Sequence, residues 1–419
     1  MENEKKNEKI KNIGNGTLRF ANENTKIIKA HNLAPTKYVF RAANGKANVL
    51  KILDTTVGSN GKWAVRIDRG HAKGATTPHI NLNNKLTGIS DPHIRIPNGA
   101  VKAAEFVNGF SDKMQASDEK QLDRALRTAL DIGYRYIDTA DLYQNEHIIG
   151  KVVEEYIKNG KFKREDIYIT SKLPTHGHRN PEIFIDRSLE RLRLDYIDLY
   201  LIHAPMPYQN NPETNEPKEE KDGKRIVDLV PFNETWKVFE KYYDEGKLKA
   251  IGLSNFNEKQ IQEVYDQAKI KPHNLQVECH ILFPQKELFN FCKNLEISFT
   301  AYAPIGSPGR TAVQKGKNLV DESPMKHSLV QKLAEKYRKS PAQILIRQMI
   351  QRGISTIPKS TNPERVKENF NVFDFELTKE EMNEFDSIGQ NTRLFLFAMG
   401  KDHPWHPWPE DVRKHLEES

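Results

Sequence analysis

From about residue 116 onward, short apolar runs alternate with segments of amphipathic helical pattern. Residues 119–133 and 145–160 place apolar side chains at helical spacing and end at Gly133 and Gly160, which are typical helix stops. Seven apolar runs have the length of buried strands, and they start near Tyr134, Ile167, Ile197, Leu248, Asn274, Ile297 and Ile354. This alternation predicts an α/β fold with a parallel sheet, and specifically a (β/α)8 TIM barrel over residues 114–419.

Four polar residues of complementary chemistry stand at the ends of the first three runs. Asp138 ends the first run, and Tyr143 follows one short loop later. Lys172 ends the second run and His203 follows the third. All strand carboxyl ends of a parallel barrel open on the same face, so these side chains can meet in one site. A tyrosine with an ordinary pKa near ~10 needs a nearby cation to donate a proton at neutral pH, and a lysine paired with a buried aspartate supplies one.

Each of these four residues also has an ordinary structural explanation when it is considered alone. Asp138 could cap the following helix, and Tyr143 could be a half-buried packing residue. Lys172 could be a surface charge, and His203 a hydrogen-bonded core histidine. Independent caps and packing residues have no reason to fall at successive strand ends. The four together therefore favour one site that donates a proton to a carbonyl oxygen.

Four further motifs follow in the order that one known family shows. They are IGLSNFN (251–257), LQVECH (275–280), TAYAPIGS (300–307) and IPKSTNPERVKENF (357–370). With these motifs and the four polar residues, the chain from about residue 115 to 419 resembles the aldo-keto reductases. The resemblance implies that bound NADPH gives a hydride to an aldehyde or ketone while Tyr143 gives the proton. It also implies that Lys172 and Asp138 tune the tyrosine and that His203 orients the carbonyl.

The same resemblance implies a cofactor site. Ser254, Asn255 and Gln276 would hold the nicotinamide carboxamide, and Tyr302 would stack on the ring. The other cofactor contacts that it implies are Ile305 and Ser307 and, at the adenosine end, Lys359, Ser360, Arg365, Glu368 and Asn369. The two cations of this set are six residues apart near the start of a predicted helix, whose amino end attracts phosphate. They favour NADP over NAD because they can neutralise a 2′-phosphate, and a solvated basic face is the alternative.

The first barrel strand is where the chain departs from this family. Members begin with a small hairpin and a Gly-rich strand that ends in a Gly-Thr-Trp-like triplet, which residues 96–122 lack. The only apolar run there is 104–110, and a barrel without an eighth strand would expose two parallel edges. Three alternatives stay open. Residues 104–110 close the barrel, the upstream quarter has displaced the first strand, or the gene model joins two parts incorrectly.

Length and composition point to more than one domain in a reducing compartment. A chain of 419 residues with 37% hydrophobic content exceeds the usual single-domain range and can bury a sizeable core. No apolar run approaches the ~20 residues of a membrane span, and the charged first residues are unlike a secretory signal. Only Cys279 and Cys292 are present, which argues against a disulfide framework. We therefore expect a cytoplasmic location.

The amino-terminal quarter differs from the rest in charge and pattern. Residues 1–113 hold 19 Lys and Arg against 9 Asp and Glu, a balance of +10, whereas the whole chain has +7. Residues 1–24 are polar and predict a disordered tail, followed by a basic β-rich module over 25–113. Within it, runs at 37–43 and 46–54 flank an Asn-Gly pair that favours a hairpin, and 62–70 adds a third strand.

A weaker resemblance concerns the loop after these strands. Residues 68–74, together with His71, His79 and His93, resemble the small toxin-type nuclease modules of bacterial secreted effectors. A histidine beside Arg and Lys could move protons while the cations hold a scissile phosphate. The alternative is a basic binding or linker module with ordinary loop histidines. The irregular histidine spacing matches no metal-ligand pattern, so no metal site is predicted.

Two long segments are expected near the barrel mouth, residues 205–232 and the tail 393–411. The tail is rich in large apolar residues that could form a lid or could pack on the barrel wall, namely Phe395, Leu396, Phe397, Trp405 and Trp408. The sequence thus predicts a monomeric NADP-dependent oxidoreductase acting on CH–OH groups, which reduces a small aldehyde or ketone to an alcohol. The alternative is a catalytically impaired barrel fused to a nucleic-acid-binding or nuclease-like module.

Overall fold

The computed structural model describes residues 116–220, 224–308, 323–389 and 391–417, together with the backbone of seven strands between residues 11 and 105. The chain divides into two compact units, residues 1–92 and 93–419. The domain boundary that we expect between residues 113 and 114 stays a prediction. Each unit is described separately below.

Within the described residues, eight parallel strands of the second unit form one sheet in the order β14-β13-β12-β11-β10-β9-β8-β7. The first and last strands of this order contact each other, so the sheet curves into a nearly closed barrel. The (β/α)8 fold predicted from the sequence is therefore confirmed. The strands are β7 Ala103–Glu105, β8 Tyr136–Asp138, β9 Tyr168–Leu173, β10 Leu199–Ile202, β11 Ile251–Ser254, β12 Asn274–Glu278, β13 Ser298–Tyr302 and β14 Ser355–Ile357.

Strand β7 occupies the place of the first barrel strand. It overlaps the predicted run 104–110 and begins one residue earlier, at Ala103. Ala104 pairs in parallel with Ile137 of β8, so the edge of β8 is covered. Of the three alternatives, the structure supports closure of the barrel by the segment just upstream of the first helix. β7 therefore covers the edge of β8 and lies in contact with β14, which leaves the barrel nearly closed.

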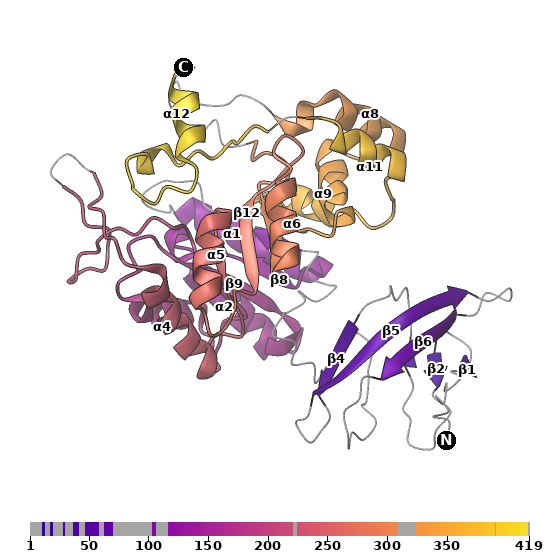
Figure 1. Cartoon of the computed structure of the whole chain (residues 1–419), viewed down its shortest axis with the longest axis horizontal. Helices are drawn as coiled ribbons and strands as arrows, with labels where there is room; N and C mark the ends of the chain where they lie inside the picture. The colour runs from indigo at the N-terminus through magenta and orange to yellow at the C-terminus, as the bar shows by residue number, and fades with distance from the viewer. Residues whose placement is uncertain are drawn as a thin grey trace, which may run out of the picture. The chain divides into compact units, whose positions relative to one another are not determined.

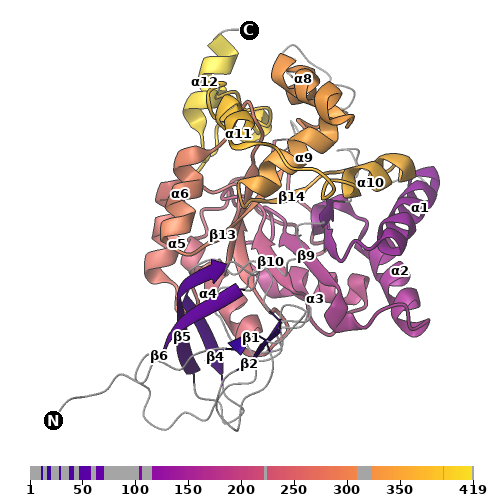
Figure 2. The ribbon, with the colours of Figure 1, turned by 90° about the vertical axis from the view of Figure 1, so that its right-hand side faces the viewer.

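Helices follow the strands in alternation, as the sequence pattern predicts. Two predicted stops, Gly133 and Gly160, take the positive φ angles of 106° and 67° that favour glycine. Helices α8, α9 and α11 lie together in both ribbon views (Figures 1 and 2). The helices are α1 Ala116–Ile132, α2 Glu146–Lys158, α3 Pro181–Leu192, α4 Phe232–Asp244, α5 Glu258–Gln267, α6 Lys286–Asn294, α8 Ser328–Tyr337, α9 Pro341–Gln351, α10 Pro363–Phe370, α11 Lys379–Asp386 and α12 Pro409–Glu417. Four short 3-10 helices are η1 Asp141–Tyr143, η2 Arg164–Asp166, η3 Pro324–Lys326 and η4 Ala398–Gly400.

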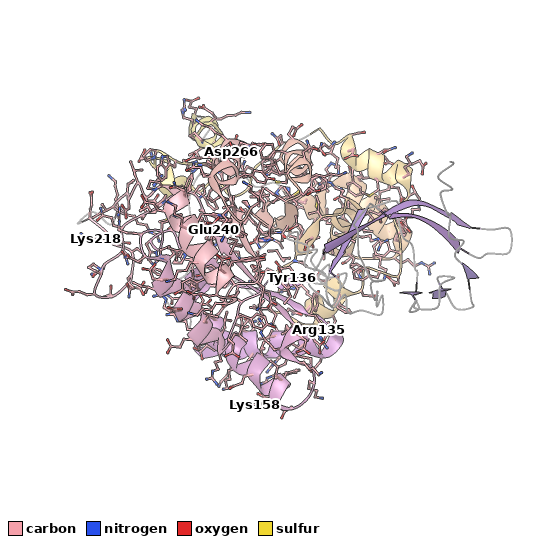
Figure 3. All side chains as sticks on the ribbon, turned by 60° about the horizontal axis from the view of Figure 1, so that its bottom comes forward. Arg135, Tyr136, Lys158, Lys218, Glu240 and Asp266 are labelled. Atoms are coloured by element: carbon pink, nitrogen blue, oxygen red, sulfur yellow. The ribbon has the colours of Figure 1, made fainter. Side chains whose placement is uncertain are left out.

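The core of the second unit lies between the sheet and the helices around it. Its large members include Phe184 of α3 and Phe239 of α4, which are both fully buried. Figure 3 shows Tyr136 within the ribbon, whereas Lys158 and Lys218 lie at the outer margin. Among the described residues, no helix combines the length and apolar character that crossing a membrane requires.

The first unit contains two small antiparallel sheets. Strands β4 Lys37–Arg41, β5 Ala47–Val57 and β6 Trp63–Arg69 form one sheet in that order, which confirms the predicted hairpin and third strand. The other sheet consists of β1 Lys11–Asn12, β2 Thr17–Arg19 and β3 Ile28–Lys29. Strands β1 and β2 stand where we expected a disordered tail. His71, His79 and His93 lie outside the described residues.

Candidate active site

The centre of the site is a buried ion pair between the ends of β8 and β9. Lys172 Nζ donates a hydrogen bond to Asp138 Oδ1 and a second one, of 2.9 Å, to the carbonyl oxygen of Thr139. Gln276 Nε2 donates to Asp138 Oδ2 across 2.7 Å. Burial raises the pKa of Asp138, and Lys172 and Gln276 act in the opposite direction. Both charges are fully buried and hydrogen-bonded, which is the condition under which a buried pair persists.

Tyr143 and His203 complete the predicted tetrad beside this pair. Tyr143 ends η1, and its ring centroid lies 5.1 Å from Lys172 Nζ. The Tyr143 and His203 rings meet edge to face, with centroids 5.7 Å apart. The structure therefore brings together all four residues that the sequence places on successive strand ends.

His203 is a neutral imidazole in this setting. Its burial and the nearby charge of Lys172 lower its pKa to about 3. Its Nδ1 atom has no hydrogen-bond partner among the described residues. A neutral imidazole has one nitrogen that donates and one that accepts, so it can orient a carbonyl without carrying charge.

The residues predicted to hold the nicotinamide lie next to the tetrad and are linked to it. Asn255 Nδ2 donates to the carbonyl oxygen of His203 across 2.8 Å, and Asn255 Oδ1 accepts from Tyr302 Oη across 2.9 Å. Asn255 has a φ of 63°, a left-handed conformation that asparagine tolerates better than most residues. Ser254 Oγ accepts from the same amide nitrogen across 3.1 Å. Gln276 reaches the tetrad through Asp138, as described above.

A second layer of polar residues supports the tetrad and was not predicted from the sequence. Thr139 Oγ1 donates to Asn145 Oδ1 across 2.6 Å, and Ser171 Oγ donates to Glu146 Oε1 across 2.7 Å. Asn145 and Glu146 begin α2 directly after the Tyr143 loop, so they tie this loop to the neighbours of Asp138 and Lys172. Burial, followed by the charge of Asp141, raises the pKa of Glu146 to about 7. An acid in the first turn of a helix also stabilises the helix dipole, so its sequence position alone does not reveal this contact.

The residues predicted for the adenosine end lie around α10, more than 200 residues along the chain from Tyr143. Asn362 caps this helix by accepting hydrogen bonds from the backbone of Glu364 and Arg365. Lys359 and Arg365 are exposed, whereas Ser360 and Asn369 are buried and Glu368 is half-buried. Ile305 and Ser307 follow β13, and Ile305 is buried.

The carboxyl-terminal tail lies at the carboxyl ends of the strands. Phe395 packs edge to face on Tyr302 at the end of β13, with centroids 5.6 Å apart. Trp405 packs on Phe232, with centroids 5.0 Å apart. His403 contacts the carbonyl oxygen of Pro207 across 2.9 Å. The tail thus joins the segment after β10 on the face where the tetrad opens.

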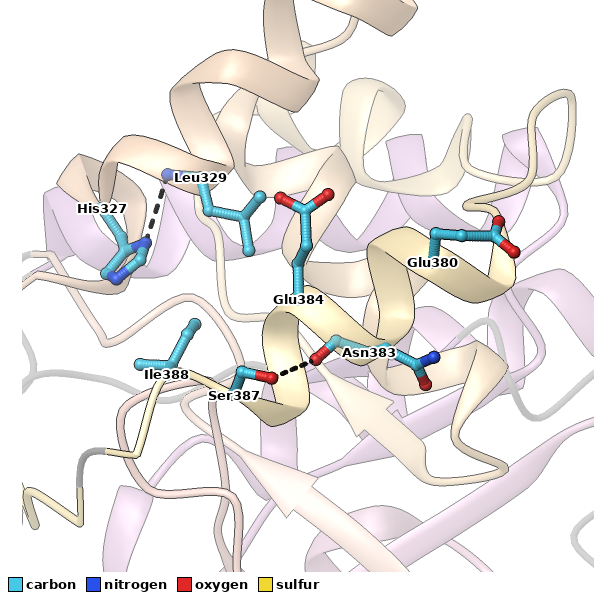
Figure 4. Close-up of a pocket in the computed structure, with 7 residues that line it drawn as sticks. All are labelled: His327, Leu329, Glu380, Asn383, Glu384, Ser387 and Ile388. Atoms are coloured by element: carbon cyan, nitrogen blue, oxygen red, sulfur yellow. Dashed lines mark hydrogen bonds between the residues drawn. The ribbon is translucent and has the colours of Figure 1, made fainter.

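A separate open hollow of about 510 Å³ lies between α8 and α11. His327, Leu329, Asn383 and Ser387 are among the residues that line it (Figure 4). No lining residue belongs to the tetrad or to the predicted cofactor contacts. The hollow is therefore not assigned to the site described above.

Comparisons with known proteins identify the family of the chain. The model of the Aldo/keto reductase family matches residues 107–390. The chain is 41% identical over 294 residues to "Aldo-keto reductase family 1 member D1" of Mus musculus, which covers 68% of this chain and 88% of that protein. It is 42% identical over 283 residues to "Aldo-keto reductase family 1 member A1" of Gallus gallus, covering 67% of this chain and 85% of that protein.

A solved structure gives the same result. The aldose reductase from Schistosoma japonicum matches with a TM-score of 0.65 and 36% identity, over 74% of this chain and 95% of that one. Fold and site together define a (β/α)8-barrel oxidoreductase. The chain belongs to the aldo/keto reductase family.

The amino-terminal region requires a correction. Residues 20–114 match the model of the C13G5.2-like N-terminal domain. This match gives no support to the resemblance to toxin-type nuclease modules. A short run of basic residues and histidines is common in loops, so it was not specific enough to identify a nuclease. The alternative of an impaired barrel fused to a nuclease-like or nucleic-acid-binding module gains no support.

Proposed function

We propose that this enzyme reduces an aldehyde or ketone to an alcohol with NADPH, and that Tyr143 donates the proton. The observation that carries the proposal is the position of Lys172 Nζ, which lies 5.1 Å from the centroid of the Tyr143 ring and is held by the buried Asp138. A cation beside a phenol stabilises the phenolate that remains after proton donation. Proton transfer near neutral pH then becomes accessible to a group whose ordinary pKa is near ~10.

Residues around the tetrad fit the nicotinamide end of the cofactor. When bound, NADPH supplies a hydride for the carbonyl carbon. The amide groups of Asn255 and Gln276 and the hydroxyl of Ser254 offer donors and acceptors that match a carboxamide. The half-buried ring of Tyr302 can stack on the nicotinamide.

The protein's own steps concern the substrate oxygen. His203, which is neutral, orients the carbonyl oxygen toward Tyr143 by a hydrogen bond. The Tyr143 Oη–H bond breaks and the proton joins the substrate oxygen, while the negative charge on the phenolate is balanced by Lys172. A proton from solvent restores Tyr143 before the next turnover. None of these proton-transfer steps uses a metal ligand from the chain.

The remaining features of the proposal concern cofactor choice and cellular setting. Lys359 and Arg365 are exposed cations around α10, and they favour NADPH because they can pair with its 2′-phosphate. Cys279 and Cys292 are both free and buried. We expect a reducing compartment such as the cytoplasm, because the chain has no cysteines beyond these two. We also expect the enzyme to act as a monomer.

The direct test is NADPH oxidation by the purified full chain with a panel of aldehydes, ketones and sugars. We expect at least one carbonyl compound to be converted to its alcohol, with one NADPH consumed for each alcohol formed. Binding of NADPH is measured in parallel by quenching of protein fluorescence. A chain that binds NADPH and yields no alcohol from any compound of the panel would contradict the proposal.

A further inference from the structure

Strand β12 carries two buried polar side chains that face the same side of the sheet. Gln276 and Glu278 are two residues apart, so they point to the same face. Gln276 contacts the tetrad through Asp138. Glu278 is fully buried at the carboxyl end of the same strand, and no part of the mechanism above uses it. A carboxylate in such a place must have compensating hydrogen bonds, because burying an unpaired charge is costly.

Those hydrogen bonds come from the tail of the chain. Glu278 Oε1 accepts from the backbone N–H of Leu394 across 2.6 Å, and Oε2 accepts from that of Phe395 across 3.0 Å. His280 Nε2 donates to Oε1 across 2.8 Å, since a carboxylate can only accept. Burial alone would raise the pKa of Glu278, but His280, Arg393 and the Leu394 N–H outweigh it and hold the pKa below its usual range.

Neighbouring contacts show that residues 392–395 anchor the tail to the barrel, and we call this segment the root of the tail. The backbone N–H of Thr392 donates to the carbonyl oxygen of Leu282 across 2.7 Å. The Arg393 guanidinium lies 4.4 Å from the centroid of the Phe283 ring and 3.7 Å from that of Trp408. Residues 392–395 are thus docked on the turn that follows β12, and Glu278 supplies the only ionised acceptor for their backbone among the contacts of the described residues.

From this root the tail reaches the substrate side of the site. Phe395, whose N–H is held by Glu278, packs on Tyr302. Phe397 packs against the buried group of Ala204, Met206 and Tyr208, which follows directly after His203. The direction in which the tail leaves its root therefore decides where its apolar side chains lie relative to the substrate carbonyl.

We propose that Glu278 is a positioning residue, which fixes the root of the tail and thereby sets the affinity of the enzyme for bulky carbonyl substrates. This inference rests on the carbonyl reduction proposed above. A small aldehyde needs only the tetrad and the cofactor. A larger substrate also needs the apolar wall that the tail provides. Its affinity should therefore fall when the root of the tail is no longer held.

The test is Glu278→Gln in the full chain. Both carboxylate oxygens accept backbone N–H groups, so either orientation of the amide directs its NH2 at one of these donors. We expect the KM of a bulky aromatic ketone to rise roughly 10- to 100-fold, as loss of a buried hydrogen bond allows. We expect kcat with a small aldehyde to change less than about twofold. Trypsin cleavage within the tail, at Arg393 or Lys401, should become at least about tenfold faster.

Glu381→Gln is the matched control. Glu381 is also a buried carboxylate that accepts a backbone N–H, that of Thr378, but it lies on α11 and contacts Lys336 and Tyr337 instead of the tail. This variant reports the general cost of losing such a carboxylate. It should leave both the ketone KM and the trypsin sensitivity of the tail unchanged.

The outcomes separate this inference from the proposed function. If Glu278→Gln leaves the tail as resistant to trypsin as in the wild type, Glu278 does not hold the root and the inference fails. If the tail is released but the KM values of ketone and aldehyde change equally, Glu278 has only a structural role and the inference fails as well. Cleavage by trypsin can be measured without reductase activity. If the wild type reduces no carbonyl compound, the proposed function is refuted, but the cleavage rates still show whether Glu278 anchors the tail.

Discussion

Charged side chains are buried in one region of the site and exposed in another. At the ends of β8 and β9, Asp138 and Lys172 are fully buried and paired with each other. Around α10, the side chains of Lys359 and Arg365 are exposed to solvent. The first region pairs its two charges inside the fold, whereas the second carries its charges at the surface.

The difference indicates a division of tasks. A buried, hydrogen-bonded pair cannot rearrange cheaply, so it keeps the cation beside Tyr143 in place before the substrate binds. Exposed charges contribute little to folding. In the function proposed above, Lys359 and Arg365 act on the binding of the 2′-phosphate. Changes in the first region should therefore alter stability and turnover, and changes in the second should alter cofactor affinity alone.

The largest effect is expected when the buried pair is broken. Lys172→Met leaves the charge of Asp138 buried without its partner and should lower the free energy of unfolding by about 3–5 kcal/mol. The double variant Asp138→Asn/Lys172→Met removes both charges and should recover much of this loss. Urea unfolding of the three proteins measures the difference.

Lys367→Met is the matched change at α10. Lys367 pairs with Glu364 across 2.9 Å, and both side chains are largely exposed. This variant should cost less than about 1 kcal/mol. Equal losses for Lys172→Met and Lys367→Met would show that burial does not distinguish the two regions.

A pH response is the next largest effect, and it is expected only in the buried region. The pKa of Glu146 is about 7 in the fold, against an ordinary value of 4.5. The fold therefore favours the protonated carboxyl, and its contribution is complete below pH 4.5 and is lost as the pH rises through 7. Relative to Glu146→Gln, the wild type should lose roughly 3 kcal/mol of stability across this window. Glu364→Gln on α10 is the control and should differ from the wild type by less than about 0.5 kcal/mol throughout.

The smallest effect concerns the exposed region. Arg365→Ala should weaken NADPH binding by roughly 1–3 kcal/mol and leave NADH binding and stability nearly unchanged, because only NADPH has a 2′-phosphate. Titration by fluorescence quenching gives both dissociation constants. Lys367→Ala, which removes another exposed cation of α10, is the control. Equal weakening of NADPH and NADH by Arg365→Ala would mean that this residue has a structural role.

The sequence reveals some parts of this site more readily than others. Asp138, Tyr143, Lys172 and His203 could be predicted because each stands at a recognisable strand end, and a parallel barrel opens all such ends on one face. Strand β7 could be placed because residues 104–110 are the only apolar run next to the gap. Its bounds are less predictable, since pairing with β8 decides them more than local pattern does.

Contacts between distant residues could not be predicted in this way. Glu278 and Leu394 are 116 residues apart, and no periodicity links them. A charged residue inside the apolar strand β12 was the available signal, because a carboxylate there requires a partner. The hydrogen bond between Ser171 and Glu146 could not be predicted for a related reason. An acid at the start of a helix is already explained by its favourable interaction with the helix dipole.

The central claim is that Tyr143 is the proton donor and that Lys172, held by Asp138, enables it. The most direct test is the turnover of Tyr143→Phe with the best carbonyl substrate of the panel, with NADPH affinity measured on the same sample. We predict a fall in kcat of at least about 10²-fold with NADPH binding unchanged, because the ring remains and only the donor is lost. Turnover within a few-fold of the wild type would contradict the account and remove Tyr143 from the reaction.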